Sequence, residues 1–186
     1  VIYPAMGAAA PFKKFWNSVL HDGVVYMNEK PELAGGAFAV DAFASASKMK
    51  ASNDFTILLQ GNNNVGDGRF ASNGWLQELP NPVTKIVWDN YAAISVQSAA
   101  ELGVDTNGTV DITIGSRKQT FPVFVQPGMA DKTIEISLGY GRSAAGAIGT
   151  GIGVNANMLI AKNAPLNERL YNNAQVTSAG GKYELI

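Results

Sequence analysis

Short runs in which apolar and polar residues alternate dominate the middle of this chain. Thr109–Ile114 (TVDITI) and Thr133–Leu138 (TIEISL) alternate strictly, which puts one face of each segment in a core and the other toward solvent. Arg117–Gln126 has a similar character, and Phe55–Gln60 (FTILLQ) has the apolar composition of a buried strand. Turn residues separate these closely spaced segments. The pattern therefore predicts a small β-barrel rather than a parallel sheet with crossover helices.

Weaker signals add three candidate strands. Val83–Trp88 alternates, Ala92–Ser95 is short and apolar, and Met158–Ala161 could form a last strand. Pro122 lies inside the Arg117–Gln126 run. Because proline has no N–H to donate, its position there predicts an edge strand or a bulge.

Two helices are expected. Apolar residues recur on one face of Phe12–Leu20 (FKKFWNSVL), as in a short amphipathic helix. Val96–Leu102 follows Ser95, whose side chain can cap a helix N-terminus, and it precedes Gly103, a natural C-terminal stop. The run Ser98–Glu101 has the spacing of a capping box.

These patterns divide the chain into three parts. We interpret residues 1–52 as an arm, a short helix and a linker, residues 53–161 as the barrel, and residues 162–186 as a polar, surface-hugging or flexible tail. Within the first part, Val24–Met27 could be a short strand, and Ala37–Met49 fits a strand or a helix.

Composition narrows the class of protein. With 46% apolar residues, the 186-residue chain can bury the core of one domain. Its 14 Lys and Arg residues balance 15 Asp and Glu residues, so no basic stripe favours nucleic acid. Zero Cys excludes thiolate metal sites and iron–sulfur ligation within these residues, and the lone His21 fits a capping or partly buried position at a helix end better than a metal ligand. No run is long and apolar enough for a membrane span, and Val1 at the start indicates a processed product or a piece of a longer chain.

The candidate chemistry centres on a glycine-rich stretch, Leu138–Asn157 (LGYGRSAAGAIGTGIGVNAN). Its six glycines indicate left-handed backbone or a close approach to it, and such a loop can present N–H groups to a ligand that carries phosphates. Two loose G-x-G-x-x-A matches fail as a Rossmann fingerprint because neither a helix nor an acid follows at the required spacing, and no Lys-Ser or Lys-Thr pair follows to make a P-loop. A glycine-rich crossover between barrel strands that binds nothing is an open alternative.

Two tryptophans, Trp75 and Trp88, precede the Ala92 strand. Either indole could stack on a flat ligand, but aromatic residues beside strands more often belong to the core. We therefore expect core positions for both.

Several motifs follow one another in an order that resembles a known family. Leu76–Pro80 (LQELP) comes first, followed by Ala100–Val104 (AELGV), Phe121–Val125 (FPVFV), Leu138–Arg142 (LGYGR) and Gly153–Ala156 (GVNA). Over roughly residues 53–160, this order resembles the C-terminal dinucleotide-binding domain of the molybdopterin oxidoreductases. The segments WLQELPNPVTKIVWDN and LGYGRSAAGAIGTGIGVNAN more closely resemble the large iron–sulfur subunit of bacterial alternative complex III.

The resemblance implies a mainly β fold, the double-psi β-barrel of the aspartate-decarboxylase-like class, with a few short helices. In molybdenum enzymes that barrel covers a pterin–guanine dinucleotide cofactor. Carried onto this chain, the implied cofactor-binding residues are Gly139, Tyr140, Gly141, Arg142 and Asn155, with Asn90 and Gln77 as weaker candidates. The guanidinium of Arg142 could pair with a pyrophosphate or pterin oxygen, and the amide of Asn155 could bind a heterocycle edge.

The resemblance also implies a larger parent protein. That parent would be an oxidoreductase subunit of a bacterial respiratory complex that oxidises quinol on the periplasmic side of the inner membrane. The present chain would contact the molybdopterin-like and ferredoxin-like regions of the parent and other subunits of the complex. No Ser-His-Asp set, framed carboxylate pair or metal cluster is visible, so we expect the isolated chain to be inactive and to hold no cofactor of its own.

Three functions stay open at this point. The barrel could be a scaffold that has lost its cofactor, a working molybdopterin guanine dinucleotide-binding domain, or an unrelated small β-barrel binding module. The ordered motifs count against the third. The small, almost entirely apolar run Ser143–Ile148 favours the first, since a cofactor site needs several polar contacts facing one cleft.

Overall fold

The computed structural model describes residues 11–25, 54–162, 164 and 169–186. The chain divides into two compact units, Val1–Met49 and Lys50–Ile186. In the first unit the predicted amphipathic helix is confirmed as α2 (Phe12–Asp22), which runs two residues beyond the expected end.

Helix α2 ends at Gly23, whose N–H donates to Val19 O over 2.9 Å. His21 lies in the last helical turn, as expected, but it is exposed rather than partly buried, and its Nδ1 is 2.8 Å from Asp22 Oδ1. Val24 and Val25 are not in a strand. The rest of the segment Val24–Met27 and the ambiguous segment Ala37–Met49 lie outside the described residues.

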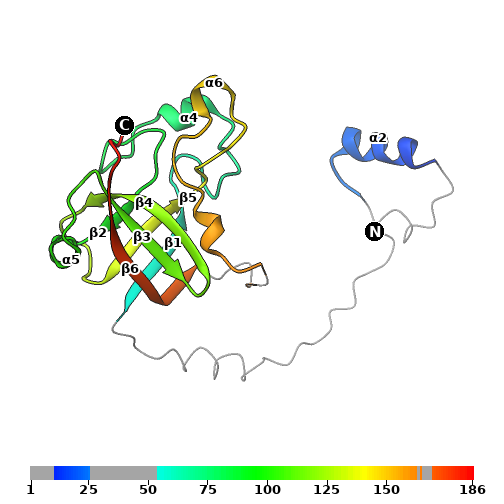
Figure 1. Ribbon diagram of the computed structural model, residues 1–186. Coiled ribbons are helices and arrows are strands. Elements are labelled where there is room, and N and C mark those ends of the chain that lie inside the picture. Colours follow the sequence, from blue (N-terminus) through cyan, green and yellow to red (C-terminus); the bar gives the residue numbers. More distant parts are fainter. Residues whose placement is uncertain (1–10, 26–53, 163, 165–168) are drawn as a thin grey trace, which may run out of the picture. The chain divides into compact units, whose positions relative to one another are not determined.

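Six strands of the second unit close into a barrel (Figure 1). They follow the order β1-β5-β2-β4-β3-β6 around the wall before β6 returns to β1. Their bounds are β1 (Phe55–Gly61), β2 (Ala92–Ile94), β3 (Gly108–Ile114), β4 (Arg117–Val125), β5 (Thr133–Leu138) and β6 (Leu170–Lys182). The strands expected near Phe55, Ala92, Thr109, Arg117 and Thr133 are thus confirmed.

The pairing pattern repeats after three strands. β1–β5 and β2–β4 are parallel, whereas β1–β6 and β3–β4 are antiparallel. If β1, β2 and β3 are matched with β4, β5 and β6, the parallel pair β1–β5 corresponds to β4–β2, and the antiparallel pair β1–β6 corresponds to β4–β3. The antiparallel pairs β2–β5 and β3–β6 correspond to themselves. The barrel therefore consists of two equivalent, interlocked halves, β1–β3 and β4–β6. The predicted fold class, a mainly β double-psi barrel with a few short helices, is confirmed.

The core forms where β3 and β5 turn alternate residues into the barrel and the other strands add their buried residues. β3 buries Val110, Ile112 and Ile114, and β5 buries Ile134, Ile136 and Leu138, as strict alternation requires. β4 adds the fully buried Phe121, which lies opposite Val110 in the β3–β4 register. A shift of one residue in that register would turn the apolar set toward water, so burial fixes the pairing.

Short helices follow the second strand of each half. α5 (Val96–Leu102) follows β2 and is capped as predicted, since Ser95 Oγ accepts from Ser98 N over 3.0 Å and Gly103 takes a left-handed conformation. The predicted capping box over Ser98–Glu101 is wrong, because Ser98 lies inside the helix as the partner of that cap. The 3₁₀ helix η1 (Ala156–Leu159) follows β5.

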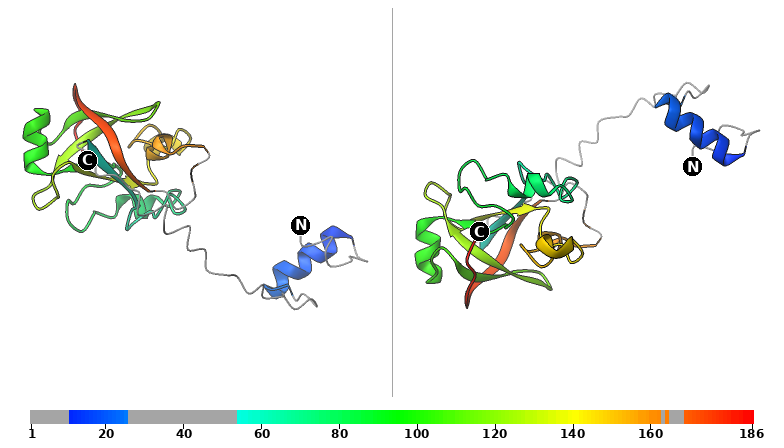
Figure 2. Two further views of the ribbon diagram at one scale, coloured as in Figure 1. Left: turned by 90° about the horizontal axis from the view of Figure 1, so that it is seen from below. Right: turned by 90° about the horizontal axis from the view of Figure 1, so that it is seen from above.

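Two further helices flank the barrel. They are α4 (Gly74–Glu78) and α6 (Gly146–Gly149), which lie close together beyond one end of the barrel in Figure 1. α5 lies on the side of the barrel away from α6 in both views of Figure 2. The glycine-rich stretch, which carries α6, therefore rises from the side opposite α5.

The last strand comes from the segment expected to be a tail. β6 pairs with both β1 and β3, and it buries Tyr171, Ala174 and Val176. A bulge in the β1–β6 pairing separates the first two of these by three positions, which removes the strict alternation that sequence analysis relies on. The predicted last strand at Met158–Ala161 is also wrong, since Met158 lies in η1. The barrel therefore extends past residue 161.

Two other strand predictions fail for local reasons. Val83–Trp88 is not a strand, because Lys85 and Trp88 have φ angles of +66° and +61°, outside the extended region. Pro122 marks neither an edge nor a bulge: it is buried opposite Thr109, where β4 changes its partner from β3 to β2. The N–H that Pro122 lacks is therefore at the position where the pairing with β3 ends and the pairing with β2 begins.

Removing residues 170–186 should abolish cooperative folding of the barrel, because β1 and β3 would each lose a neighbour and their buried faces would open to water. Circular dichroism and thermal melts of the full and truncated chains measure this. Adding a peptide of residues 169–186 should restore the transition. A truncated chain that melts cooperatively within about 5 °C of the full chain would contradict the assignment of β6.

Candidate functional site

The two ends of the glycine-rich stretch pack directly against each other. Gly141 has a φ of +75°, and a Cβ at this position would lie 2.1 Å from Asn155 N and 2.5 Å from Val154 C. Gly139 has a φ of +96°, and a Cβ there would lie 2.9 Å from Gly68 N. Close backbone packing therefore explains both glycines without a ligand.

The side chain of Asn90 fixes the returning end of the stretch. Its Nδ2 donates to Ser137 O (2.8 Å) and Val154 O (2.9 Å), and its Oδ1 accepts from Val154 N (2.7 Å). The fully buried amide thus bonds both backbone groups of Val154, as a neighbouring strand would, and ties them to β5. Asn90 belongs to the scaffold of the stretch.

Asp89, which sequence analysis missed, is a buried carboxylate that joins three segments. Oδ1 accepts from Gly153 N (3.1 Å) and from the Tyr183 hydroxyl (2.7 Å), and Oδ2 accepts from Ile186 N (3.2 Å). The C-terminal residues are held further by Val87 N, which donates to Ile186 O over 2.8 Å. The only signal in the sequence was an acid between Trp88 and Asn90, in a segment interpreted as a strand.

An open cleft of about 410 Å³ lies along the start of the glycine-rich stretch. Five of the seven predicted site residues line it: Gly139, Tyr140, Gly141, Arg142 and Asn155. Other lining residues were not predicted, among them Asp67, Ser143 and Asn157. Asp67 comes from a separate loop that only the fold brings to the stretch, whereas Asn157 is the last residue of the stretch and lies in η1.

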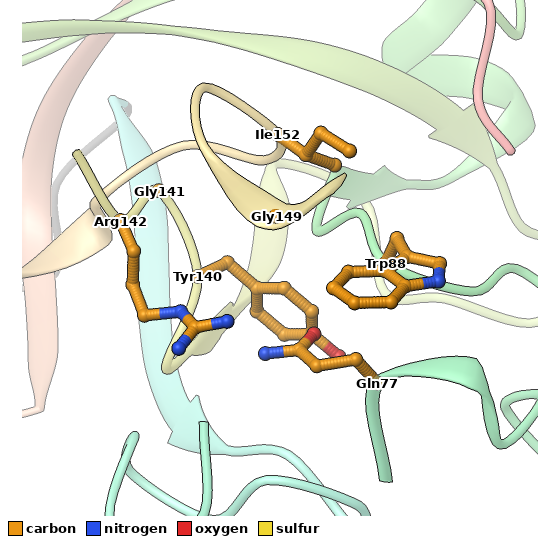
Figure 3. Close-up of a pocket in the computed structure, with 7 residues that line it drawn as sticks. All are labelled: Gln77, Trp88, Tyr140, Gly141, Arg142, Gly149 and Ile152. Carbon is orange, nitrogen blue, oxygen red and sulfur yellow. The ribbon is translucent and has the colours of Figure 1, made fainter. Parts of the chain in front are cut away.

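A second, much smaller cavity adjoins the first. It holds about 10 Å³, room for a single water molecule, and shares Tyr140, Gly141 and Arg142 with the cleft. Gln77 and Trp88 close its other side, and their side chains converge with Tyr140 and Arg142 on the same small space (Figure 3). The weaker candidate Gln77 is thus beside the cleft, whereas Asn90 lines neither space.

Charges in the cleft are unevenly paired. Asp67 bonds Arg69 through Oδ1 and Nε (3.0 Å) and through Oδ2 and Nη2 (3.1 Å), and the hydrogen bonds from Arg69 lower the pKa of Asp67 to about 2. Within the described residues, the Arg142 guanidinium has no hydrogen-bond or ion-pair partner. The cleft therefore offers one unpaired cation, Arg142, and one ionised carboxylate, Asp67, whose charge is already balanced by Arg69.

Two tyrosines around the stretch stay neutral. Burial raises the pKa of Tyr140 to about 12, and Tyr91 and Asp89 nearby add to the effect. Burial, together with the hydrogen bond to Asp89, also raises the pKa of Tyr183 to about 12. At neutral pH both phenols are therefore uncharged, and the Tyr183 hydroxyl donates to Asp89.

The two tryptophans differ. Trp88 is half-buried against the small cavity, while Trp75 is 85% exposed on α4, so the expectation of a core position for Trp75 is wrong.

Within the described ranges, no group of three or more His, Asp or Glu side chains is placed to hold a metal ion. No helix in that part of the chain has the length and apolar character needed to cross a bilayer.

Comparison with known proteins gives a distant structural likeness and no match in sequence. No protein-family model matches the chain, and no curated protein matches it. Among solved structures, the chain is similar to acetylene hydratase from Pelobacter acetylenicus, with 12% sequence identity and a TM-score of 0.43. That match covers 80% of this chain and 19% of the other, so the present chain spans about a fifth of the length of that protein.

Gly141→Ala should lower the free energy of unfolding by about 3 kcal/mol or more, because its Cβ would overlap the backbone of Asn155 and the stretch would have to separate. Gly151→Ala is the matched control: its φ of +82° is similar, but no atom lies within 4 Å of the added Cβ. Backbone strain alone should cost that variant about 1–2 kcal/mol. Urea titration measures both, and equal losses would show that φ and not packing sets the need for glycine.

Proposed function

We propose that this barrel is the C-terminal, dinucleotide-binding-like domain of a larger iron–sulfur subunit of the molybdopterin-oxidoreductase kind, and that it is a scaffold without chemistry of its own. The parent would belong to a respiratory, quinol-oxidising complex of the alternative complex III type, on the periplasmic side of the inner membrane. The ordered motifs and the closed double-psi barrel support this proposal together. The barrel would act by packing against neighbouring parts of the parent and its complex.

One observation carries the scaffold role: a single segment, residues 70–83, exposes four large apolar side chains. They are Phe70, Trp75, Leu79 and Val83, with Trp75 the most exposed. Exposed apolar side chains gathered in this way are typical of surfaces that meet another protein, where tryptophan often dominates the binding energy. We call residues 70–83 the Trp75 segment.

The Trp75 segment is held in a fixed shape. Asn73 Oδ1 caps α4 by accepting from Trp75 N (3.1 Å) and Leu76 N (3.3 Å). Asn81 Oδ1 accepts from Val83 N over 2.9 Å, and Asn64 Nδ2 donates to Leu79 O. A preformed surface loses less conformational entropy on binding than a flexible loop, which favours a docking role.

In the intact parent protein, the double substitution Trp75→Ser and Val83→Ser should reduce the yield of assembled complex at least tenfold, because both side chains lose their apolar contact with a neighbour. Val96→Ser is the control, since Val96 is also exposed but lies on α5. The yield of assembled complex is measured by size-exclusion chromatography of the complex purified from its host. The thermal midpoint of the isolated chain should stay unchanged, and full assembly of the double variant would contradict the scaffold role.

A second candidate function, a working binding domain for molybdopterin guanine dinucleotide, is favoured by the cleft. Arg142, whose guanidinium is unpaired, lines one space of about 410 Å³ together with Tyr140, Asn155 and Asn157, and these residue types fit a group that carries phosphates. The polar lining is richer than the apolar run Ser143–Ile148 led us to expect. In that function these residues would bind and orient the cofactor, which would supply the redox chemistry.

Metal and pterin content separates the two candidates. The intact parent, purified from its host with its iron retained, should contain no molybdenum by mass spectrometry and no fluorescence of an oxidised pterin if the barrel is a scaffold. About one equivalent of molybdenum per parent protein, as one bound cofactor requires, would overturn the scaffold proposal and support the binding function.

A further inference from the structure

Gln77 carries a buried acceptor that the fold leaves unused. The side chain is 4% exposed, and its Nε2 donates to Ala71 O over 3.2 Å. In the described part of the chain, its Oε1 has no hydrogen-bond partner. A buried amide oxygen without a donor is unfavourable, so a donor that can reach it would stabilise the fold.

The nearest source of free donors is Arg142. Its guanidinium and the Gln77 amide line the same cavity of about 10 Å³ beside the Tyr140 ring, with the amide nitrogen on the side of the guanidinium (Figure 3). A guanidinium has five N–H donors, and those of Arg142 have no acceptor within the described residues. Each side chain thus lacks the kind of partner that the other provides.

The space around the guanidinium depends on a small neighbour. A Cβ at Gly149 would lie 3.2 Å from Arg142 Nη2 and 3.3 Å from Trp88 Cζ3. A larger residue at this position would crowd both side chains. The absence of a side chain at 149 leaves the guanidinium room to turn.

Arg142 also borders the open cleft, which the small cavity adjoins. We propose that Arg142 has two positions: with the cleft empty, its guanidinium reaches across the small cavity, past the Gln77 amide nitrogen, and donates to Gln77 Oε1, and it turns to the cleft when an anionic group enters. Gln77 is then a positioning residue: its Oε1 accepts from the guanidinium until an anionic group enters the cleft, and this bond gives the buried oxygen its donor. The resting position depends only on the cavity, whereas the cleft position rests on the proposed binding function.

A double-mutant cycle on the full 186-residue chain at pH 7, without ligand, tests the resting position. Gln77→Glu keeps the size of the side chain and adds a negative charge, but it also removes the Nε2 donor to Ala71 O in every background. The thermal midpoint of the Gln77→Glu chain, relative to the matching Gln77 chain, should therefore be about 2–4 °C higher when Arg142 is present than when it is replaced. In the Arg142→Met background the same change should lower the midpoint, because it buries an unpaired carboxylate. In an Arg117→Met background, which removes an arginine that bonds Leu159 O instead, Gln77→Glu should behave as in the parent chain.

An equal effect of Gln77→Glu in the parent and Arg142→Met backgrounds would overturn the proposal and leave a water molecule as the partner of Gln77. If a variant of the cycle fails to fold, the unaltered chain still gives an answer by nuclear magnetic resonance. Its Arg142 Nε–H should be protected from exchange with water, and Gln77→Leu should reduce that protection at least tenfold. An unprotected Nε–H would also overturn the proposal. Inorganic pyrophosphate is the probe for the cleft position, and it should remove the protection in the unaltered chain.

No parent complex and no cofactor enters the cycle. A negative result there leaves the scaffold role of the Trp75 segment untouched, and failure of the assembly experiment leaves the Gln77–Arg142 pair untouched. The two proposals can therefore fail separately.

Discussion

Closure of the barrel by strands distant in sequence is the constraint on which the rest of this structure depends. β1 pairs on one side with β5, where Thr56 meets Thr133, and on the other with β6, where Phe55 meets Ala174. Neither contact exists until a long loop has closed, so the chain gains little from any half of the barrel alone. The glycine-rich stretch starts at the last residue of β5 and returns at η1. Its two anchor points are therefore fixed only when the wall is complete.

Once the wall exists, two adjacent side chains decide the shape of the stretch. The Asn90 amide bonds the backbone N–H and C=O of Val154, as the backbone of a neighbouring strand would. Asp89 accepts from Gly153 N and also from the Tyr183 hydroxyl and Ile186 N. Removing either would leave buried backbone groups without partners, which is more costly than losing an exposed bond. The cleft is thus shaped by residues that do not line it, and its geometry is linked to the C-terminal residues through one carboxylate.

Alternation was enough to predict β3 and β5, because each buries one face along its whole length. It missed β6, where a bulge puts Tyr171 and Ala174 three positions apart, and it wrongly gave Val83–Trp88 a strand, because nothing in the pattern reports the left-handed φ of Lys85 and Trp88. The glycine-rich motif located most of the cleft, since its residues are contiguous. Asp67 could not be found in this way, because only the three-dimensional fold brings its loop beside the motif, whereas Asn157 is the last residue of the motif itself and was not selected.

Packing accounts for many of the features that first indicated a ligand. Gly139 and Gly141 are needed where backbones touch, and the polar atoms of Asn90 are used within the fold. Packing does not account for the Arg142 guanidinium or for Gln77 Oε1, and both residues line a cavity that holds one water molecule. A scaffold that had lost all binding function would gain stability by replacing Gln77 with an apolar residue of similar volume, since a buried acceptor without a donor is costly. Any binding capacity that the barrel retains is therefore concentrated at this one cation, whereas in the proposed scaffold role the exposed Trp75 segment would provide the surface for assembly.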